Sequence, residues 1–350
     1  MAKSKQKPSK ERPSDKTSPS GLRLFIFGCI TFVLSPLLFL LATEILLRLI
    51  GYGYPTSYFI EVESKNYFAP NDRFPYRFFP PSLIRSPVLD IIEREKPEDQ
   101  YRIFLLGGSA ARGTPDPCYS VARFLEVLLE NRFRGFDFKV VNTAMTAINS
   151  HVVREIAGDC CRFEPDCFVV YCGNNEVVGP YGPATVFQKF SLSLAAVRAS
   201  VLLRRLKLSQ LISDAAAFLG LKKREGKTWK GLQLFEMNKI PKWDKRLDFV
   251  YRSFRSNLLA ICREAIDVGA KVVLCTVPVN LKDFSPFRSM HKEKLAESQR
   301  RQWEESFDKG RKLLSAGEYA KALKAFKAVS YTHLRAHETR HDLVCRLLLE

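Results

Sequence analysis

The chain has 350 residues, of which 46% are hydrophobic and 26% are charged, so it is long and apolar enough to form a sizeable core and one or two compact domains. Its 55 Lys and Arg residues exceed its 37 Asp and Glu residues, giving a net charge of +18. Such a surplus is also found in nucleic-acid-binding proteins. Here a basic tail lies directly before an apolar segment, so we expect a membrane-flanking role and no nucleic-acid partner.

The amino-terminal part predicts a basic tail at residues 1–23 and a transmembrane helix at residues 24–50. Residues 24–42 are almost all Leu, Phe, Ile and Val, and nineteen residues at helical rise nearly span a bilayer core. No small-residue cleavage site of the signal-peptide type is evident. Because Lys and Arg precede the helix, we expect a cytoplasmic tail, a single pass through the inner membrane, and a periplasmic or extracellular main part.

Residues 51–100 are rich in Pro, Tyr and Phe without a sustained period, and we interpret them as a spacer that packs along the next domain. From residue 101 onward, apolar runs alternate with helical patterns. The runs lie at residues 103–106, 140–141, 168–172 and 271–276. This alternation predicts an α/β domain with a mostly parallel sheet over residues 101–295.

Residues 186–230 form a helical insertion within that domain, with one or two amphipathic helices. Arg204, Arg205 and Lys207 lie beside a leucine-rich stretch. Two interpretations stay open, a helix lying on the membrane surface and a solvated basic face.

Residues 300–328 resemble one tetratricopeptide repeat, a helix–turn–helix unit that binds protein partners. The resemblance depends on six positions, Gly310, Leu313, Gly317, Tyr319, Ala322 and Phe326. The alternative is a generic helical hairpin. A single repeat cannot bury its own apolar face, so the pattern predicts a partial repeat array.

Residues 329–350 resemble the conceptual translation of a sequencing-library adapter, and we interpret them as a non-native tail. Residues 337–341 match H-E-x-x-H, which is a zinc-protease signature. Because this motif falls in the tail, we expect neither a zinc protease nor another metal site.

Three predicted strands end in glycine, serine or amide residues. The first is followed by Gly107, Gly108 and Ser109, the second by Asn142-Thr143-Ala144, and the third by Gly173-Asn174-Asn175-Glu176. The carboxyl ends of parallel strands meet at one edge of a sheet, which is where open α/β folds place their chemistry. Ser109, at the bend between a strand and a helix, is therefore the candidate nucleophile.

These three loops resemble the conserved blocks of the SGNH/GDSL hydrolases of the membrane-anchored bacterial kind, over residues 101–287. The resemblance implies a flavodoxin-like three-layer α/β/α fold, incomplete in this chain, and an esterase without a cofactor. It implies Ser109 as the nucleophile and the amides of Ser109 and Ala144 with the Asn175 carboxamide as oxyanion donors. Gly107, Gly108 and Gly173 would support the loops. The substrate would be an acyl or acetyl ester, with acetylated envelope polysaccharide as one candidate.

Residues 229–231 and 277–281 also resemble the branch of this family that carries tetratricopeptide repeats. The family takes its base from an Asp-x-x-His motif near the carboxyl end, and no such motif occurs before residue 329. His151 and His291 are the only histidines there; we interpret His151 as a helix-start or packing residue and His291 as part of a charged segment. A serine without a base is a poor nucleophile. We therefore expect this chain to be a truncated, inactive piece of a hydrolase.

Three other functions are alternatives. Gly107-x-Ser109-x-Ala111 nearly matches the nucleophile elbow of α/β-hydrolases, although that serine normally follows several strands. A dinucleotide enzyme is disfavoured because G-x-G-x-x-G spacing is absent. A non-catalytic, membrane-anchored scaffold or carbohydrate-binding protein is the alternative from another class.

Overall fold

The computed structural model describes residues 21–62, 66–187, 191–221, 240, 244–278 and 296–332. The tail before residue 21, the 229–231 motif, His291 and residues 333–350 lie outside this part of the chain. The chain divides into two compact units, Met1–Gly53 with Leu206–Leu219 and Tyr54–Arg205 with Gly220–Glu350.

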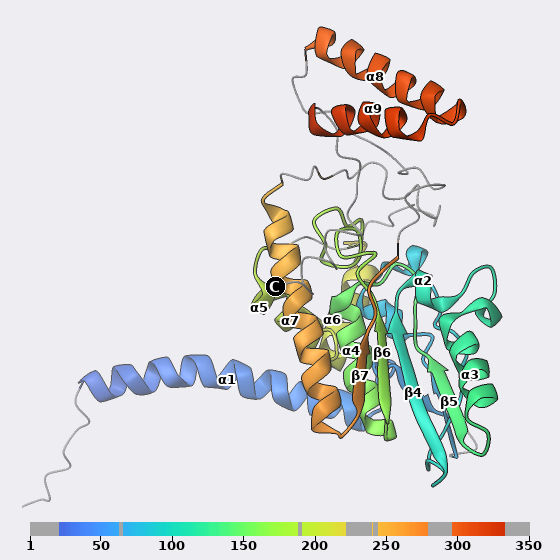
Figure 1. The fold of residues 1–350 in the computed structure, drawn as a ribbon. Coiled ribbons are helices and arrows are strands. Elements are labelled where there is room, and N and C mark those ends of the chain that lie inside the picture. Colours follow the sequence, from blue (N-terminus) through green and yellow to red (C-terminus); the bar gives the residue numbers. More distant parts are fainter. Residues whose placement is uncertain are drawn as a thin grey trace, which may run out of the picture. The chain divides into compact units, whose positions relative to one another are not determined.

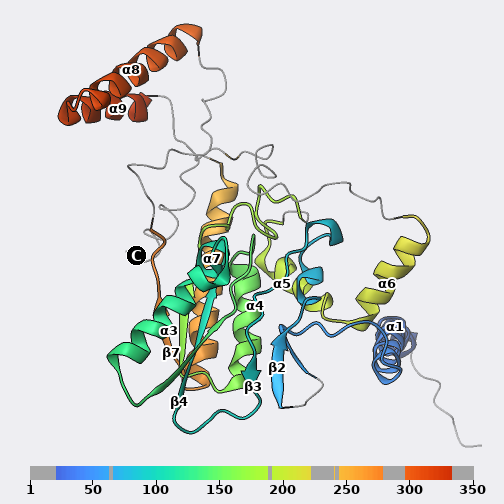
Figure 2. The ribbon, with the colours of Figure 1, turned by 90° about the vertical axis from the view of Figure 1, so that its right-hand side faces the viewer.

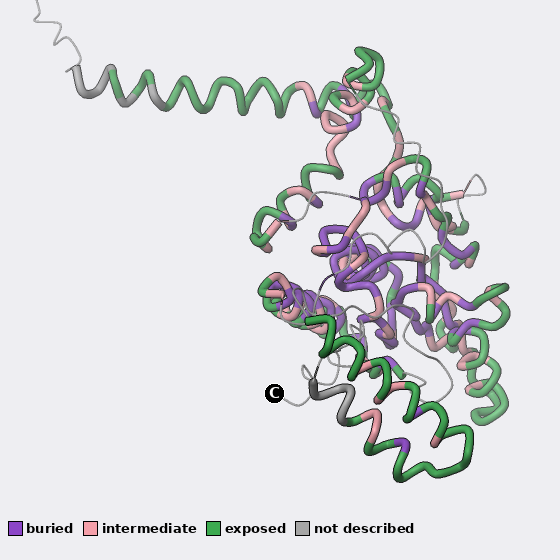
Figure 3. The backbone as a smooth tube through the Cα atoms, turned by 90° about the horizontal axis from the view of Figure 1, so that it is seen from above, coloured by how far each residue is buried: buried purple, intermediate pink, exposed green. Residues whose placement is uncertain are grey.

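The first unit contains a long apolar helix, α1 (Gly21–Leu49), and the amphipathic helix α6 (Lys207–Phe218). Its Ile30–Leu49 segment has a mean hydropathy of 2.2 and is long and apolar enough to span a membrane. Most of α1 is exposed (Figure 3). Near its end, the Glu44 carboxylate accepts hydrogen bonds from the backbone N–H groups of Lys207 at 3.1 Å and Leu208 at 2.8 Å. Figure 2 shows α6 beside α1. Glu44 thus caps α6 in place of a residue from α6 itself.

The second unit is built on four parallel strands in the order β5-β4-β6-β7 (Figure 1). Their bounds are β4 (Gln100–Gly107), β5 (Asp137–Asn142), β6 (Cys167–Tyr171) and β7 (Lys271–Leu274). In chain order this is 2-1-3-4, the beginning of the flavodoxin-like order. The structure therefore confirms the predicted α/β class and parallel sheet.

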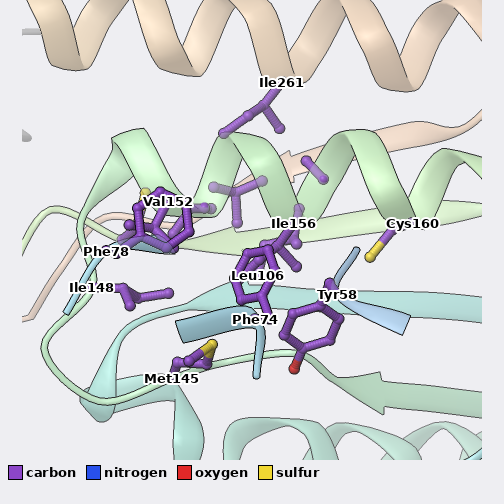
Figure 4. Packing of buried hydrophobic residues seen from close by; sticks show 14 of the residues in the cluster. Tyr58, Phe74, Phe78, Leu106, Met145, Ile148, Val152, Ile156, Cys160 and Ile261 are labelled. Atoms are coloured by element: carbon purple, nitrogen blue, oxygen red, sulfur yellow. The ribbon is translucent and has the colours of Figure 1, made fainter. Parts of the chain in front are cut away.

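Helices cover both faces of this sheet, which gives three layers. The helices concerned are α3 (Val121–Arg132), α4 (Ser150–Cys160) and α7 (Arg246–Asp267). Alternate strand residues point to opposite faces. Ile103 and Leu105 pack in a cluster with Ala122 of α3, whereas Phe104 and Leu106 pack in the main core with α4 and α7. Figure 4 shows Leu106 beside α4 in that main core.

The remaining helices of the second unit are short or form a separate hairpin. They are α2 (Ser109–Arg112), α5 (Leu194–Leu203), α8 (Glu297–Ser315), α9 (Tyr319–Thr332) and the 3-10 turns Pro117–Tyr119 and Cys161–Phe163. Between α8 and α9, a Cβ at Gly310 would come within 2.6 Å of the Phe326 ring. This close packing explains why glycine is required there, and the pair has the helix–turn–helix form predicted from the sequence.

Residues 51–100 contain structure that the sequence pattern did not indicate. Three short strands, β1 (Phe59–Glu61), β2 (Tyr67–Pro70) and β3 (Ile92–Glu93), form an antiparallel sheet, and 3-10 turns occur at Phe74–Arg77 and Pro81–Leu83. Tyr58, Phe74 and Phe78 are fully buried in the main core (Figure 4). The aromatic residues of this segment are therefore part of the same core as the sheet.

A buried ion-pair network fixes this segment to α4. The Arg77 guanidinium, 2% exposed, donates to the Glu155 carboxylate at 2.6 Å, and Arg205 donates to the same oxygen at 2.7 Å. Burial alone would raise the pKa of Glu155, but the two guanidinium groups outweigh it and lower that pKa. One turn further along α4, Asp159 accepts a hydrogen bond from the backbone N–H of Tyr58 at 2.6 Å.

We expect Arg77→Ala to destabilise the chain by about 3 kcal/mol. The buried Glu155 carboxylate would lose its one buried cation and keep only the half-exposed Arg205, and the packing of the Arg77 side chain would also be lost. The matched control is Arg123→Ala, which breaks an exposed pair with Glu126 and should cost less than about 1 kcal/mol. Urea unfolding in a neutral detergent measures both. If both variants lose the same free energy of unfolding, the network does not stabilise the fold as we expect.

Candidate active site

The three predicted loops meet at the carboxyl edge of the sheet. Gly107, the last residue of β4, pairs with Tyr171 at the end of β6. Its carbonyl oxygen also accepts a hydrogen bond at 3.1 Å from the backbone N–H of Met145, in the loop after β5. A Cβ at Gly107 would lie 2.5 Å from the Tyr171 backbone oxygen, so no side chain fits there. These backbone contacts bring the ends of β4, β5 and β6 together.

Ser109 is the first residue of α2 and directly follows the bend at Gly108. It is half-buried, and in the described part of the chain its hydroxyl makes no hydrogen bond. The hydroxyl is therefore accessible, and no group among the described residues accepts a hydrogen bond from it as a general base would.

Asn175 lies beside the Gly108–Ser109 bend. Its Nδ2 is 3.1 Å from the position that a Cβ on Gly108 would occupy, and it donates to the Ile148 carbonyl at 2.9 Å. A carboxamide carries two N–H donors, so one remains for a ligand. Gly173, with φ of +135°, supplies the left-handed turn by which the chain reaches Asn175 from β6. The structure thus brings together the first and third predicted blocks.

Ala144 is fully buried and its amide already has a partner. The Ala144 N–H donates to Asn142 Oδ1 at 3.2 Å, and Asn142 Nδ2 donates to the Arg112 carbonyl at the end of α2 at 3.1 Å. This second loop therefore lies next to α2. Its amide can act on a ligand only if it leaves or shares the Asn142 oxygen.

Sequence reasoning assigned no role to Glu176, which holds two of the loops together. Its carboxyl group, 4% exposed, accepts hydrogen bonds from the Ser150 backbone N–H at 2.8 Å and the Ser150 hydroxyl at 2.7 Å. Ser150 begins α4, whose N-cap residue Asn149 makes no capping bond of its own. Burial raises the pKa of Glu176 to about 7. The acidic position of the G-x-N-[DE] motif was the available signal for this contact.

His151 is the one histidine in the described residues, and it is buried as the packing interpretation predicted. Its Nδ1 lies 3.1 Å from Asn257 Nδ2 of α7. Burial, together with the nearby Arg198 and Arg154, lowers the pKa of His151 to about 4. The imidazole is therefore neutral near pH 7, and among the described residues it makes no hydrogen bond with Ser109.

The described residues contain no group of three or more His, Cys, Asp or Glu side chains placed to hold a metal ion. The H-E-x-x-H residues of the predicted non-native tail lie outside these residues.

The structural similarity of the chain to known proteins is weak. No family model matches the chain, and no curated protein matches it in sequence. The chain is similar to a solved structure described as the crystal structure of TesA, with 13% identity and a TM-score of 0.28. The match covers 51% of this chain, which spans only 61% of the length of that structure.

We expect Glu176→Gln to change the pH dependence of stability. The folded chain binds the Glu176 proton more tightly than the unfolded chain, so its contribution to stability falls as the pH rises from about 4.5 to about 7. Glutamine does not titrate. When the pH rises from 5 to 8, the free energy of unfolding of the Gln variant should therefore increase by about 2 kcal/mol relative to that of the unsubstituted chain.

Urea unfolding at the two pH values measures this difference, with the exposed Glu130→Gln as the matched control. If the free energies of unfolding of the Glu176→Gln variant and the parent differ by the same amount at both pH values, the raised pKa of Glu176 is refuted.

Proposed function

We propose that the protein is a serine ester hydrolase of the SGNH/GDSL type that acts on an acyl or acetyl ester outside the cytoplasm. α1 would be its single-pass anchor in the inner membrane, with the amino terminus in the cytoplasm. The observation that carries the proposal is the position of the Asn175 carboxamide beside the Gly108–Ser109 bend. A nucleophile and a side-chain donor that come from different strand ends are what acyl transfer needs at one carbon atom.

In this proposal Ser109 attacks the ester carbonyl carbon and forms an acyl-enzyme, and the alcohol leaves with a proton. The negative oxygen of the tetrahedral intermediate accepts hydrogen bonds from the Ser109 amide and the free N–H of Asn175. The Ala144 amide joins them when it leaves the Asn142 oxygen. Each donor would lower the barrier by about 3 kcal/mol, because the charge on that oxygen develops only in the transition state.

The base of this reaction lies outside the described residues in our proposal. Ser109 has no hydrogen-bond partner among them, and His151 is occupied by Asn257. An Asp-x-x-His motif in an intact reading frame beyond residue 328 would supply the imidazole. The 350-residue chain itself would then be inactive.

The Ser109 hydroxyl, which has no hydrogen-bond partner among the described residues, also favours a second candidate function. A membrane-anchored scaffold needs no base, and the α8–α9 hairpin would provide its surface for a protein partner. The sheet edge would then bind carbohydrate without cleaving it. The two candidates differ in whether Ser109 contributes to ester hydrolysis.

We expect the 350-residue chain to hydrolyse p-nitrophenyl acetate at a rate that Ser109→Ala changes less than about twofold, because an unactivated serine adds little. A chain that carries the intact frame beyond residue 328 should be faster, and Ser109→Ala should reduce its rate at least about 10³-fold. If the intact-frame chain and its Ser109→Ala variant have equal rates, the hydrolase is excluded and the scaffold is favoured.

In the intact-frame chain, Asn175→Ala should lower kcat about 10²-fold while KM changes little, because the donor acts on the transition state. The matched control is Asn131→Ala on α3, whose exposed amide bonds only to the Val127 carbonyl. Steady-state kinetics on p-nitrophenyl acetate measure both. A loss that appears only in KM would contradict the oxyanion role of Asn175.

A further inference from the structure

The second unit carries an arginine-lined groove that the proposed hydrolase does not use. The groove lies between α5 and α7 and has a volume of about 450 Å³. Four arginines line it, Arg198 from α5 and Arg252, Arg255 and Arg263 from α7. Leu259 and Ala260 complete its apolar part. A groove of this volume accommodates a ligand of headgroup size.

The positive charge of the groove is largely uncompensated. In the part of the chain that the structure describes, Arg252, Arg255 and Arg263 form no ion pair or hydrogen bond through their guanidinium groups. Glu264, the one acidic residue among those that line the groove, lies 3.4 Å from Arg154 Nε of α4 and also acts on Arg198, so four guanidinium groups share one carboxylate with Arg154. Like charges three residues apart on a helix repel each other, so Arg252 and Arg255 favour a bound anion between them.

Arg198 is held in place for such a ligand. Its Nη2 donates to the Ser256 hydroxyl of α7 at 2.8 Å, which fixes the guanidinium between the two helices. Its Nε is buried and has no hydrogen-bond partner. Burial and the nearby Arg154 lower the pKa of Arg198, whereas Glu264 raises it. A buried donor without an acceptor is costly, and an anion in the groove would supply the acceptor.

We propose that this groove is a binding site for a phosphate group, recognised by Arg198, Arg252, Arg255 and Arg263. Planar guanidinium groups bind phosphate oxygens through paired hydrogen bonds, which a scattered lysine surface does not provide. The phosphate belongs either to a lipid headgroup or to a free phosphate compound. The site is independent of ester hydrolysis and needs no base.

The test uses the full chain in a neutral detergent at constant ionic strength. The probes are inorganic pyrophosphate, short-chain phosphatidylglycerol below its micelle concentration, and the phosphatidylcholine of the same chain length. Malonate serves as a dicarboxylate control. We expect a phosphate probe at tenfold its Kd to raise Tm by about 3 °C. Phosphatidylglycerol acting at lower concentration than pyrophosphate identifies a lipid headgroup, and the reverse identifies a free phosphate compound.

The combined variant Arg252→Gln and Arg255→Gln should weaken binding about tenfold or more, because it removes charge-assisted hydrogen bonds. The matched control, Arg132→Gln and Arg134→Gln on the other side of the sheet, removes the same charge and should bind as before. The proposal is overturned if no phosphate probe raises Tm, if both double variants lose binding equally, or if malonate binds as tightly as pyrophosphate.

Discussion

The buried contact between Glu176 and Ser150 is the constraint on which the candidate site depends. Glu176 and Asn175 are consecutive residues of the loop after β6, and both bind the segment that leads into α4. Asn149 of that segment in turn donates to the Pro180 carbonyl at 2.8 Å. If a buried carboxyl group loses its hydrogen bonds, the folded state is destabilised by several kcal/mol. The loop therefore has one favourable position. The Asn175 amide is therefore placed against Gly108 by its neighbours.

α4 is fixed at a second place, by residues that precede the sheet in the chain. Glu155 and Asp159 lie one turn apart on α4 and bind Arg77 and the Tyr58 backbone, respectively. The amino-terminal end of α4 belongs to the site, whereas its middle and end belong to this network. Because a helix transmits displacement along its axis as a nearly rigid body, the aromatic segment before β4 contributes to the position of the site without touching it. This segment is thus a structural part of the second unit.

The sheet could be predicted from the sequence, whereas the contacts that complete the site could not. Strands buried on both faces appear as continuous apolar runs, so residues 103–106 and 168–170 indicate their structure locally. The strands before residue 100 have two to four residues each and therefore no usable period. Glu176 and Ser150 are 26 residues apart, and only the parallel crossover places them together. Tertiary packing therefore determines both the short strands and the capping of α4.

The environment of His151 has a consequence for the proposed reaction. A general base works best when its pKa lies near the pH at which the reaction runs, because it must both accept a proton and return it. Burial and two nearby guanidinium groups lower the pKa of His151 to about 4, so its imidazole is a weak base even though it is neutral. The surroundings that let His151 pack against α7 thereby make it unsuitable to activate Ser109. The proposed hydrolase consequently needs an imidazole in a more polar place, approaching Ser109 from a segment outside the loops that follow β4, β5 and β6.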